Sequence, residues 1–203
     1  MTSMPLLEND LDPNPFVQFG RWFEDAKASQ PHLPEAMTLA TASLDGVVSA
    51  RTLLLKGFDQ RGFVFFTNYN SRKGSQIHDN PLAALCWFWR DPDRQVRAEG
   101  AIVKTTEEES EAYWKTRPRG SQLGAWASDQ TKVILGRGGL EERFRELEAN
   151  YRGVDVPRPP HWGGYRVIPN LIEFWQGRAD RLHDRFVYRL RESKDWVIER
   201  LSP

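Results

Sequence analysis

The chain has 203 residues, of which 28 are basic and 28 are acidic, so it carries no formal net charge. A balanced chain lacks the strong positive field of a nucleic-acid-binding protein, and any basic cluster in it suits a small anion better than a polymer. Its single cysteine, Cys86, excludes an intramolecular disulfide framework and a cysteine-based metal cluster. No apolar run approaches the roughly 20 residues of a membrane-spanning helix, and the N-terminus does not resemble a secretory signal, so we expect a cytoplasmic protein without a membrane partner.

The first predicted elements follow an N-terminal arm. Residues 1–14 show little apolar periodicity and are expected to be flexible, whereas residues 15–203 are expected to form a single domain. The spacing of Phe16, Phe19 and Trp22 predicts an amphipathic helix over 15–29. Short apolar segments separated by turns then predict an antiparallel meander: AMTLATAS, VVSARTLLLKGF, FVFFTN, AALCWFW and QVRAEGAIVK.

Helices are predicted between the later strands. Thr106 and Glu109 form a capping box for a helix over 107–117, which Pro118 ends. A second amphipathic helix is marked by Leu140, Phe144, Leu147 and Tyr151. The segments YRVIP, LIEFWQG, FVYRL and WVIERL supply the last strands. The expected fold class is therefore mainly β with added helices (α+β), built on an antiparallel β-barrel.

Four basic clusters are candidates for anion binding, and the first lies in EFWQGRADRLHDR, residues 173–185. If 180–187 is extended, Arg181, His183 and Arg185 share one strand face and repel each other unless an anion or carboxylates lie between them. The alternative is a solvated strand edge that blocks sheet aggregation.

The second and third clusters lie at a helix start and on a strand. Ser71 can cap a helix that begins with Arg72 and Lys73, where free N–H groups and the helix dipole attract phosphate; the alternative is an exposed, solubilising turn. In RTLLLK, Arg51 and Lys56 point to opposite faces of a strand unless a bulge intervenes. These charges can also be strand-end groups that reach water.

The fourth cluster combines a helix with the loop after it. Tyr113 and Arg117 are four residues apart and share a helix face, and Ser121 follows the break at Pro118. Two hydroxyls and a guanidinium are good donors for a phosphate monoester, although a tyrosine such as Tyr113, taken singly, is more often a half-buried core residue. Metal-ligand spacing among the histidines, a GxSxG motif, a P-loop and a GxGxxG turn are all absent.

From residue 16 to the C-terminus, the chain resembles the pyridoxamine 5′-phosphate oxidase family. The motifs that carry the resemblance are RTLLLKGFD, FTNYNSRKG, RQVRAEG, RPRGSQLGAWAS, PPHWGGYRV, IEFWQGRADRLHDR and WVIERLSP. The resemblance implies a split β-barrel homodimer that binds FMN at the subunit interface. It also implies oxidation of pyridoxamine or pyridoxine 5′-phosphate to pyridoxal 5′-phosphate by O2, with release of hydrogen peroxide and, from the amine, ammonia.

The resemblance further implies a set of site residues. FMN would be held by Arg51, Thr52, Leu53, Leu54, Leu55, Lys56, Phe66, Thr67, Arg72, Lys73, Gln95, Gln130, Thr131, Trp175 and Arg185. The substrate would be held by Lys56, Tyr113, Arg117, Ser121, Arg181 and His183, of which Arg181 and His183 would be catalytic.

The chain also departs from the family pattern. Thr131 replaces a common serine, Phe66 replaces a frequent tyrosine, and no arginine precedes Arg21 where some members carry an Arg-Arg-x-Tyr segment that closes over the substrate. Two alternatives stay open: a related split-barrel flavin oxidase for another substrate, such as a phenazine precursor, and a non-catalytic protein that stores FMN or pyridoxal 5′-phosphate.

Overall fold

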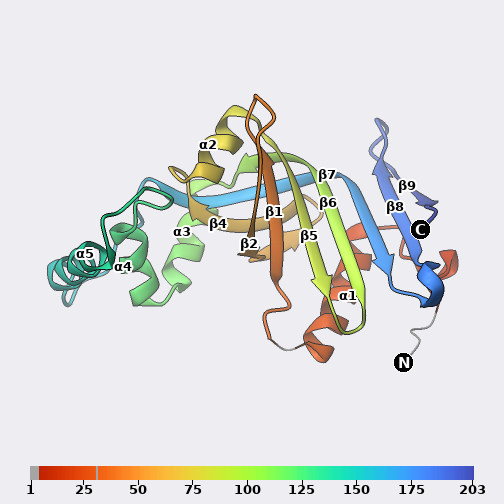
Figure 1. Ribbon diagram of the computed structural model, residues 1–203, viewed down its shortest axis with the longest axis horizontal. Coiled ribbons are helices and arrows are strands. Elements are labelled where there is room, and N and C mark those ends of the chain that lie inside the picture. The colour runs from red at the N-terminus through yellow and green to blue at the C-terminus, as the bar shows by residue number, and fades with distance from the viewer. Residues whose placement is uncertain (1–4, 31) are drawn as a thin grey trace.

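The computed structural model describes residues 5–30 and 32–203. In these residues the chain forms one antiparallel sheet flanked by helices (Figure 1). Within these residues the strand order is β2–β1–β5–β6–β7–β4–β3, with β8 paired to β7 and β9 to β8. The strands are β1 (Ala36–Ala42), β2 (Val48–Leu54), β3 (Gly57–Asp59), β4 (Gly62–Asn68), β5 (Leu82–Trp89), β6 (Arg94–Lys104), β7 (Trp162–Gln176), β8 (Asp184–Leu190) and β9 (Trp196–Arg200). The helices are α1 (Pro15–Ser29), α2 (Arg72–Asp79), α3 (Glu107–Thr116), α4 (Arg119–Ala127) and α5 (Arg137–Asn150), with short 3-10 turns at Glu8–Asp10 and Ala179–Arg181. The expected fold class is confirmed.

Helix α1 closes the main hydrophobic core. Its N-cap, Asn14, accepts a hydrogen bond from the backbone N–H of Phe16, and Pro15 occupies the first turn, where no N–H is needed. Phe19 then packs edge-on against Trp87, with ring centroids 4.9 Å apart. Trp87 and Trp89 are both buried within the protomer, whereas Phe88 between them is 56% exposed. The two tryptophans of the WFW segment therefore face α1, and Phe88 is the large side chain that the segment leaves exposed.

Strand β7 is the longest strand of the described sheet and connects the two ends of the molecule. YRVIP and LIEFWQG, which were predicted as separate strands, are continuous, with an irregularity opposite Glu99/Gly100. Strand β6 runs along β7, while β4 pairs with residues 162–167 and β8 with residues 171–176. In Figure 1, helices α3, α4 and α5 gather beyond the β4 end, and β8, β9 and the C-terminus lie at the other end.

A second, smaller core lies at the helical end. Thr106 caps α3 and Glu109 completes the predicted capping box. Pro118 ends that helix as expected, but a further helix, α4, begins at the next residue and was not predicted. Trp114, Leu123 and Trp162 join α3, α4 and β7 in this core. The tertiary contacts of Leu123 stabilise a short helix that the local sequence signals only weakly.

The residues before α1 pack against the β8–β9 end. Leu6 is buried in the main core, and the hydroxyl of Tyr188 donates to the carbonyl of Asp12 at 2.7 Å. Arg200 forms ion pairs with Glu8 at 2.8 Å and with Asp184 at 2.9 Å. Residues 1–4 lie outside the described residues, and the flexibility expected of 1–14 stays a prediction. Among the described helices, none combines the length and the apolar character needed to cross a membrane.

Candidate functional site

The first part of the candidate site is a buried lysine at the start of α2. Ser71 caps this helix, as predicted, and Lys73 lies in its first turn with only 5% of its surface exposed. The ammonium group of Lys73 donates to Gln130 Oε1 at 2.6 Å, Ser71 Oγ at 3.1 Å and Thr67 Oγ1 at 3.2 Å, all neutral acceptors. Burial, and then the positive charge of Arg51, lower the pKa of Lys73 from 10.5 to about 8.

Two arginines complete this cationic cluster. Arg51, on β2, donates to Thr41 Oγ1 at 2.7 Å; burial, and then the charge of Arg72, lower its pKa. The backbone N–H of Arg72 donates to Thr131 Oγ1 at 2.9 Å, which places Gln130 and Thr131 beside the helix start. In the described part of the chain, no ion pair joins Arg51, Arg72 or Lys73 to a carboxylate. Three uncompensated cations at a helix N-terminus have the donor chemistry of a phosphate site.

The second part of the site is an aromatic stack that carries an arginine. The rings of Phe66, on β4, and Tyr113, on α3, stack with centroids 4.0 Å apart, and the ring of Trp162 lies nearly parallel to both, 5.5 Å from Phe66 and 6.2 Å from Tyr113. The guanidinium of Arg117 lies over Trp162 at 4.4 Å and donates through Nη2 to the carbonyl of Ser121 at 3.0 Å.

Arg117 is incompletely satisfied by the protein. Its Nη1 is buried and has no hydrogen-bond partner within the described residues. Burial lowers the pKa of Arg117, and Tyr113 offsets part of that shift. A buried guanidinium nitrogen without a partner costs free energy unless a ligand supplies an acceptor. This part of the site therefore fits a second anion.

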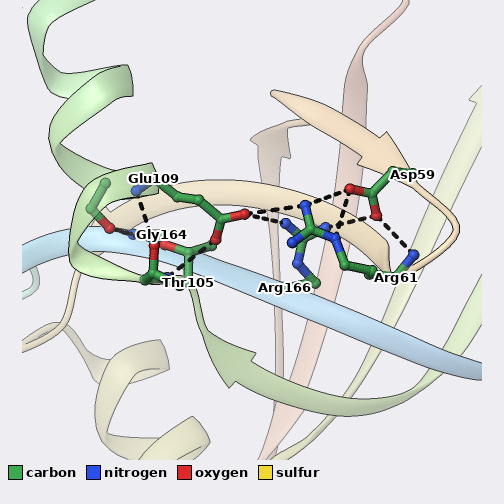
Figure 2. Close-up of polar contacts among 8 residues, drawn as sticks. Asp59, Arg61, Thr105, Glu109, Gly164 and Arg166 are labelled. Atoms are coloured by element: carbon green, nitrogen blue, oxygen red, sulfur yellow. Dashed lines mark hydrogen bonds and ion pairs between the residues drawn. The ribbon is translucent and has the colours of Figure 1, made fainter.

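A charge network fixes the base of helix α3 (Figure 2). Arg166, on β7, is buried and bridges Asp59 on β3, at 3.1 Å, and Glu109 on α3, at 2.9 Å. Arg61 pairs with the same two carboxylates at 2.7 and 3.2 Å. Because Tyr113 lies one turn after Glu109, the network determines where Tyr113 enters the stack.

The predicted strand that carries Arg51 and Lys56 is interrupted. Strand β2 ends at Leu54 and β3 begins at Gly57, so the continuous strand expected over 47–58 is wrong. The break lets the backbone N–H of Lys56 donate to the carbonyl of Val64 on β4 at 2.8 Å. Lys56 is exposed, whereas Leu55 is buried in the main core.

The third part of the site lies at the other end of β7. Gln95, Trp175 and Arg185 are direct cross-strand partners on β6, β7 and β8, so they form one row across the sheet. The ring of His183 lies against Trp175 with centroids 4.6 Å apart, and its Nδ1 accepts a hydrogen bond from the backbone N–H of Arg178 at 3.1 Å. In the neutral ring the proton is therefore on Nε2, which can donate to a ligand.

The segment between β7 and β8 is a turn rather than a strand. Residues Ala179–Arg181 form a 3-10 turn, with φ of 57° at Asp180 and 61° at Arg181, and β8 begins only at Asp184. The expected shared face of Arg181, His183 and Arg185 on an extended 180–187 is therefore wrong. Two consecutive left-handed residues are a strained backbone that the surrounding structure must hold. Arg181 is exposed on this turn.

The parts of the site lie at opposite ends of one protomer. Thr67 pairs with Gly163 near the start of β7, whereas Trp175 pairs with Arg185 at its end. These two positions on β7 are twelve residues apart, which corresponds to roughly 40 Å of extended strand. A single mononucleotide cannot span that length, so one protomer cannot bring the predicted flavin residues of both ends to the same ligand.

Two residues that the sequence motifs left without a role are part of this arrangement. The ring of Trp162 contacts both the ring of Phe66 and the guanidinium of Arg117. Glu173 forms an ion pair with Arg185, at the end of the Gln95–Trp175–Arg185 row. The signal for Glu173 was present in the sequence, because a residue two positions from Trp175 on a strand shares its face.

Two family models match the chain. The model described as pyridoxamine 5′-phosphate oxidase matches residues 23–151. The model described as the pyridoxine 5′-phosphate oxidase C-terminal dimerisation region matches residues 162–203. Together they cover the second half of α1, all elements from β1 through α5, and the whole of β7, β8 and β9.

Curated relatives match over nearly the whole chain. Proteins named pyridoxine/pyridoxamine 5′-phosphate oxidase are 58% identical in Paraburkholderia phymatum, over 96% of this chain and 92% of the relative. In Rubrobacter xylanophilus the identity is 57%, over 100% of this chain and 93% of the relative. In Acaryochloris marina it is 56%, over 98% and 90% respectively.

Two solved structures share the fold. PhzG from Burkholderia lata 383, solved in complex with tetrahydrophenazine-1-carboxylic acid, has a TM-score of 0.92 and 33% identity and covers 100% of both chains. A pyridoxamine 5′-phosphate oxidase-related, FMN binding protein from Nostoc punctiforme has a TM-score of 0.75 and 18% identity, over 95% of this chain and 98% of its own. At that identity the likeness of the second structure concerns the fold alone.

Proposed function

The chain belongs to the pyridoxamine 5′-phosphate oxidase family, and we propose that it oxidises pyridoxamine or pyridoxine 5′-phosphate to pyridoxal 5′-phosphate, with FMN as its cofactor. The observation that carries this proposal is a pair of anion sites that consecutive residues of β4 contact: Thr67 accepts from Lys73, and Phe66 stacks on Tyr113 in the aromatic group that carries Arg117. A flavin mononucleotide and a phosphorylated pyridine each bring one phosphate and one aromatic ring, which is what the two sites require.

The residues around α2 fit the FMN phosphate. Lys73 and Arg72 would bind it at the positive end of the helix dipole, and Arg51 would add a third positive charge. Thr67, Gln130 and Thr131 would orient these groups, since they already contact Lys73 and Arg72. When bound, FMN would accept a hydride equivalent from the C4′ carbon of the substrate and pass the electrons to O2, yielding hydrogen peroxide.

The residues around Arg117 fit the substrate phosphate. The free Nη1 of Arg117 would donate to a phosphate oxygen, and the hydroxyls of Tyr113 and Ser121, with the ammonium of Lys56, would supply further donors. Charge-assisted bonds of this kind hold the substrate in one orientation, which is the main contribution a protein makes to cofactor chemistry.

The remaining residues would come from a second copy of the chain. Gln95, Trp175 and Arg185 would contact the flavin, and Arg181 and His183 the substrate, from the β8 end of the partner in a homodimer. The separation of the two ends along β7, and the match to a dimerisation region over residues 162–203, support this arrangement. A closed two-fold dimer would then contain two equivalent sites.

Anaerobic mixing tests the proposed function. FMN-loaded protein is mixed with pyridoxamine 5′-phosphate without oxygen, and the visible absorbance of the flavin is followed. We expect rapid bleaching, then recovery on admitting air, with pyridoxal 5′-phosphate and hydrogen peroxide formed. Bound flavin that does not bleach would refute the oxidase and favour a storage protein.

The structural likeness to PhzG makes a phenazine precursor the second candidate substrate. The donor set around Arg117 favours a phosphorylated substrate instead, because a phosphate has more acceptor oxygens than a carboxylate for Nη1 of Arg117, the hydroxyls of Tyr113 and Ser121 and the ammonium of Lys56. Steady-state assays with both substrate classes distinguish them: the proposal predicts that only the B6 phosphates give saturable turnover.

A further inference from the structure

Glu173 is a buried carboxylate on the face that carries the Gln95–Trp175–Arg185 row. It is 3% exposed, and it lies two residues before Trp175 on β7, so both side chains are on the same face. Its Oε1 accepts from Nε of Arg185 at 2.9 Å and from Nη2 at 2.8 Å. Its Oε2 accepts from Nη2 of Arg97 at 2.9 Å. The carboxylate therefore bridges two guanidinium groups on neighbouring strands.

All three nitrogens of Arg185 are held by the protein. Nε and Nη2 bond to Glu173, and Nη1 donates to the carbonyl of Ser202 at 3.1 Å. A guanidinium is planar and has five N–H donors, so three such bonds determine its plane and leave two N–H groups, one on each Nη, for a ligand. Arg185 is thus oriented before any ligand binds.

The two halves of the bridge differ in quality. Arg185 contacts Glu173 through two nitrogens, Nε and Nη2, which share the single oxygen Oε1, so two nitrogens of the guanidinium are held at one point. Arg97 contacts Glu173 through one nitrogen, and its Nε is buried without a partner in the described residues. A carboxylate that only connected neighbouring strands would be expected to contact the two arginines equally. The geometry favours a role in orienting that arginine.

We propose that Glu173 is a positioning residue for the active site: it holds the guanidinium of Arg185 in the orientation in which two N–H groups contact the flavin. The inference rests on the proposed function, because it takes Arg185 to be a flavin contact. Glu173 itself would not touch FMN, so its effect passes through Arg185 alone.

The test compares Glu173→Gln with Arg97→Gln. In Glu173→Gln, an NH2 group replaces one of the two carboxylate oxygens. That NH2 group and the guanidinium it faces are both donors, so one hydrogen bond is lost together with the negative charge. The second variant removes the other half of the same bridge and leaves the Glu173–Arg185 contact intact. Apo-protein is titrated into FMN with flavin fluorescence as the readout, and the thermal unfolding of each apo-variant is measured beside it.

We expect Glu173→Gln to raise the FMN dissociation constant about tenfold, the loss of one oriented charged contact. Arg97→Gln should lower the unfolding temperature about as much as Glu173→Gln does. It should change the FMN dissociation constant by no more than about twofold. Equal effects of the two variants on affinity, or no effect of Glu173→Gln, would overturn the inference. Wild-type protein that binds no FMN would instead refute the proposed function.

Glu173→Asp covers the case in which Glu173→Gln does not fold. The aspartate keeps the negative charge and the balance with both arginines, but it is one methylene too short to keep the two-nitrogen contact. A folded Glu173→Asp variant with weakened FMN binding supports positioning, because the charge is unchanged. A folded variant with wild-type FMN affinity contradicts it.

Discussion

Raising the pH should weaken FMN binding through a single lysine. In the protein without ligand, burial lowers the pKa of Lys73 from 10.5 to about 8, because its ammonium has only neutral acceptors. A phosphate dianion beside it would restore the ordinary preference for the charged form and raise that pKa. Binding therefore takes up a proton wherever the free protein has already lost it, and affinity must fall as the pH rises past 8.

The size of the effect follows from the two pKa values. Between pH 7, where both states are protonated, and pH 9, where the free protein is mainly neutral at Lys73, the FMN dissociation constant should rise about tenfold. If the bound pKa returns to 10.5, the full shift corresponds to roughly 3 kcal/mol. The lowered pKa of Lys73 also makes the stability of the apo-protein depend on pH. Below pH 8 the folded protein bears the full cost of burying the charged lysine. Between pH 8 and 10.5 the unfolded chain binds more protons than the folded protein, so the free energy of unfolding rises with pH.

Fluorescence titrations of FMN at pH 7, 8 and 9 measure the slope of the FMN dissociation constant against pH. The phosphate of FMN is already dianionic across this range, since its second pKa is near 6. Calorimetry in two buffers of different ionisation enthalpy reports the proton uptake directly. The matched control is Lys73→Met, which should bind FMN weakly and without the slope. An equal slope in Lys73→Met would refute the reasoning, because another group would then be titrating.

Three further predictions test the rest of the site. Arg117→Met should raise KM for pyridoxine 5′-phosphate about tenfold or more, since it removes a charge-assisted contact, while FMN affinity stays unchanged; a proportional loss of FMN affinity would contradict the separation of the two anion sites. Arg166→Met should lower the free energy of unfolding in urea by about 1–3 kcal/mol, because Asp59 and Glu109 lose a buried partner, whereas Arg189→Met, which breaks an exposed pair, should cost less than about 1 kcal/mol. Lys73→Met and Arg185→Met should each be impaired, but a co-refolded mixture should recover up to about a quarter of wild-type activity, because half of the dimers are hybrids and each hybrid has one intact site; no recovery would argue against a site shared between subunits.

The sequence by itself determined the local elements and the chemical character of the site. Side-chain caps such as Ser71 and Thr106 act within a few residues, so the helix starts they predict occur where expected. The alternation along the strands and the helical spacing before β1 likewise depend only on neighbours in the chain. The basic and aromatic residue types that gather around Lys73 and Arg117 were also visible as motifs.

Only the tertiary structure decided which of these residues meet. The row of Gln95, Trp175 and Arg185 depends on the register of three strands, and no local pattern sets that register. The continuous β7 placed the two groups of site residues at opposite ends of a protomer, and the left-handed turn at Asp180 and Arg181 separates side chains that an extended 180–187 would have put on one face. Glu173 shows the same limit: its sequence marks it as one charge among many, and its role follows from two arginines that approach it from other strands. Such pairings join residues far apart in the chain, and their free energy comes from packing and burial that exist only in the folded protein.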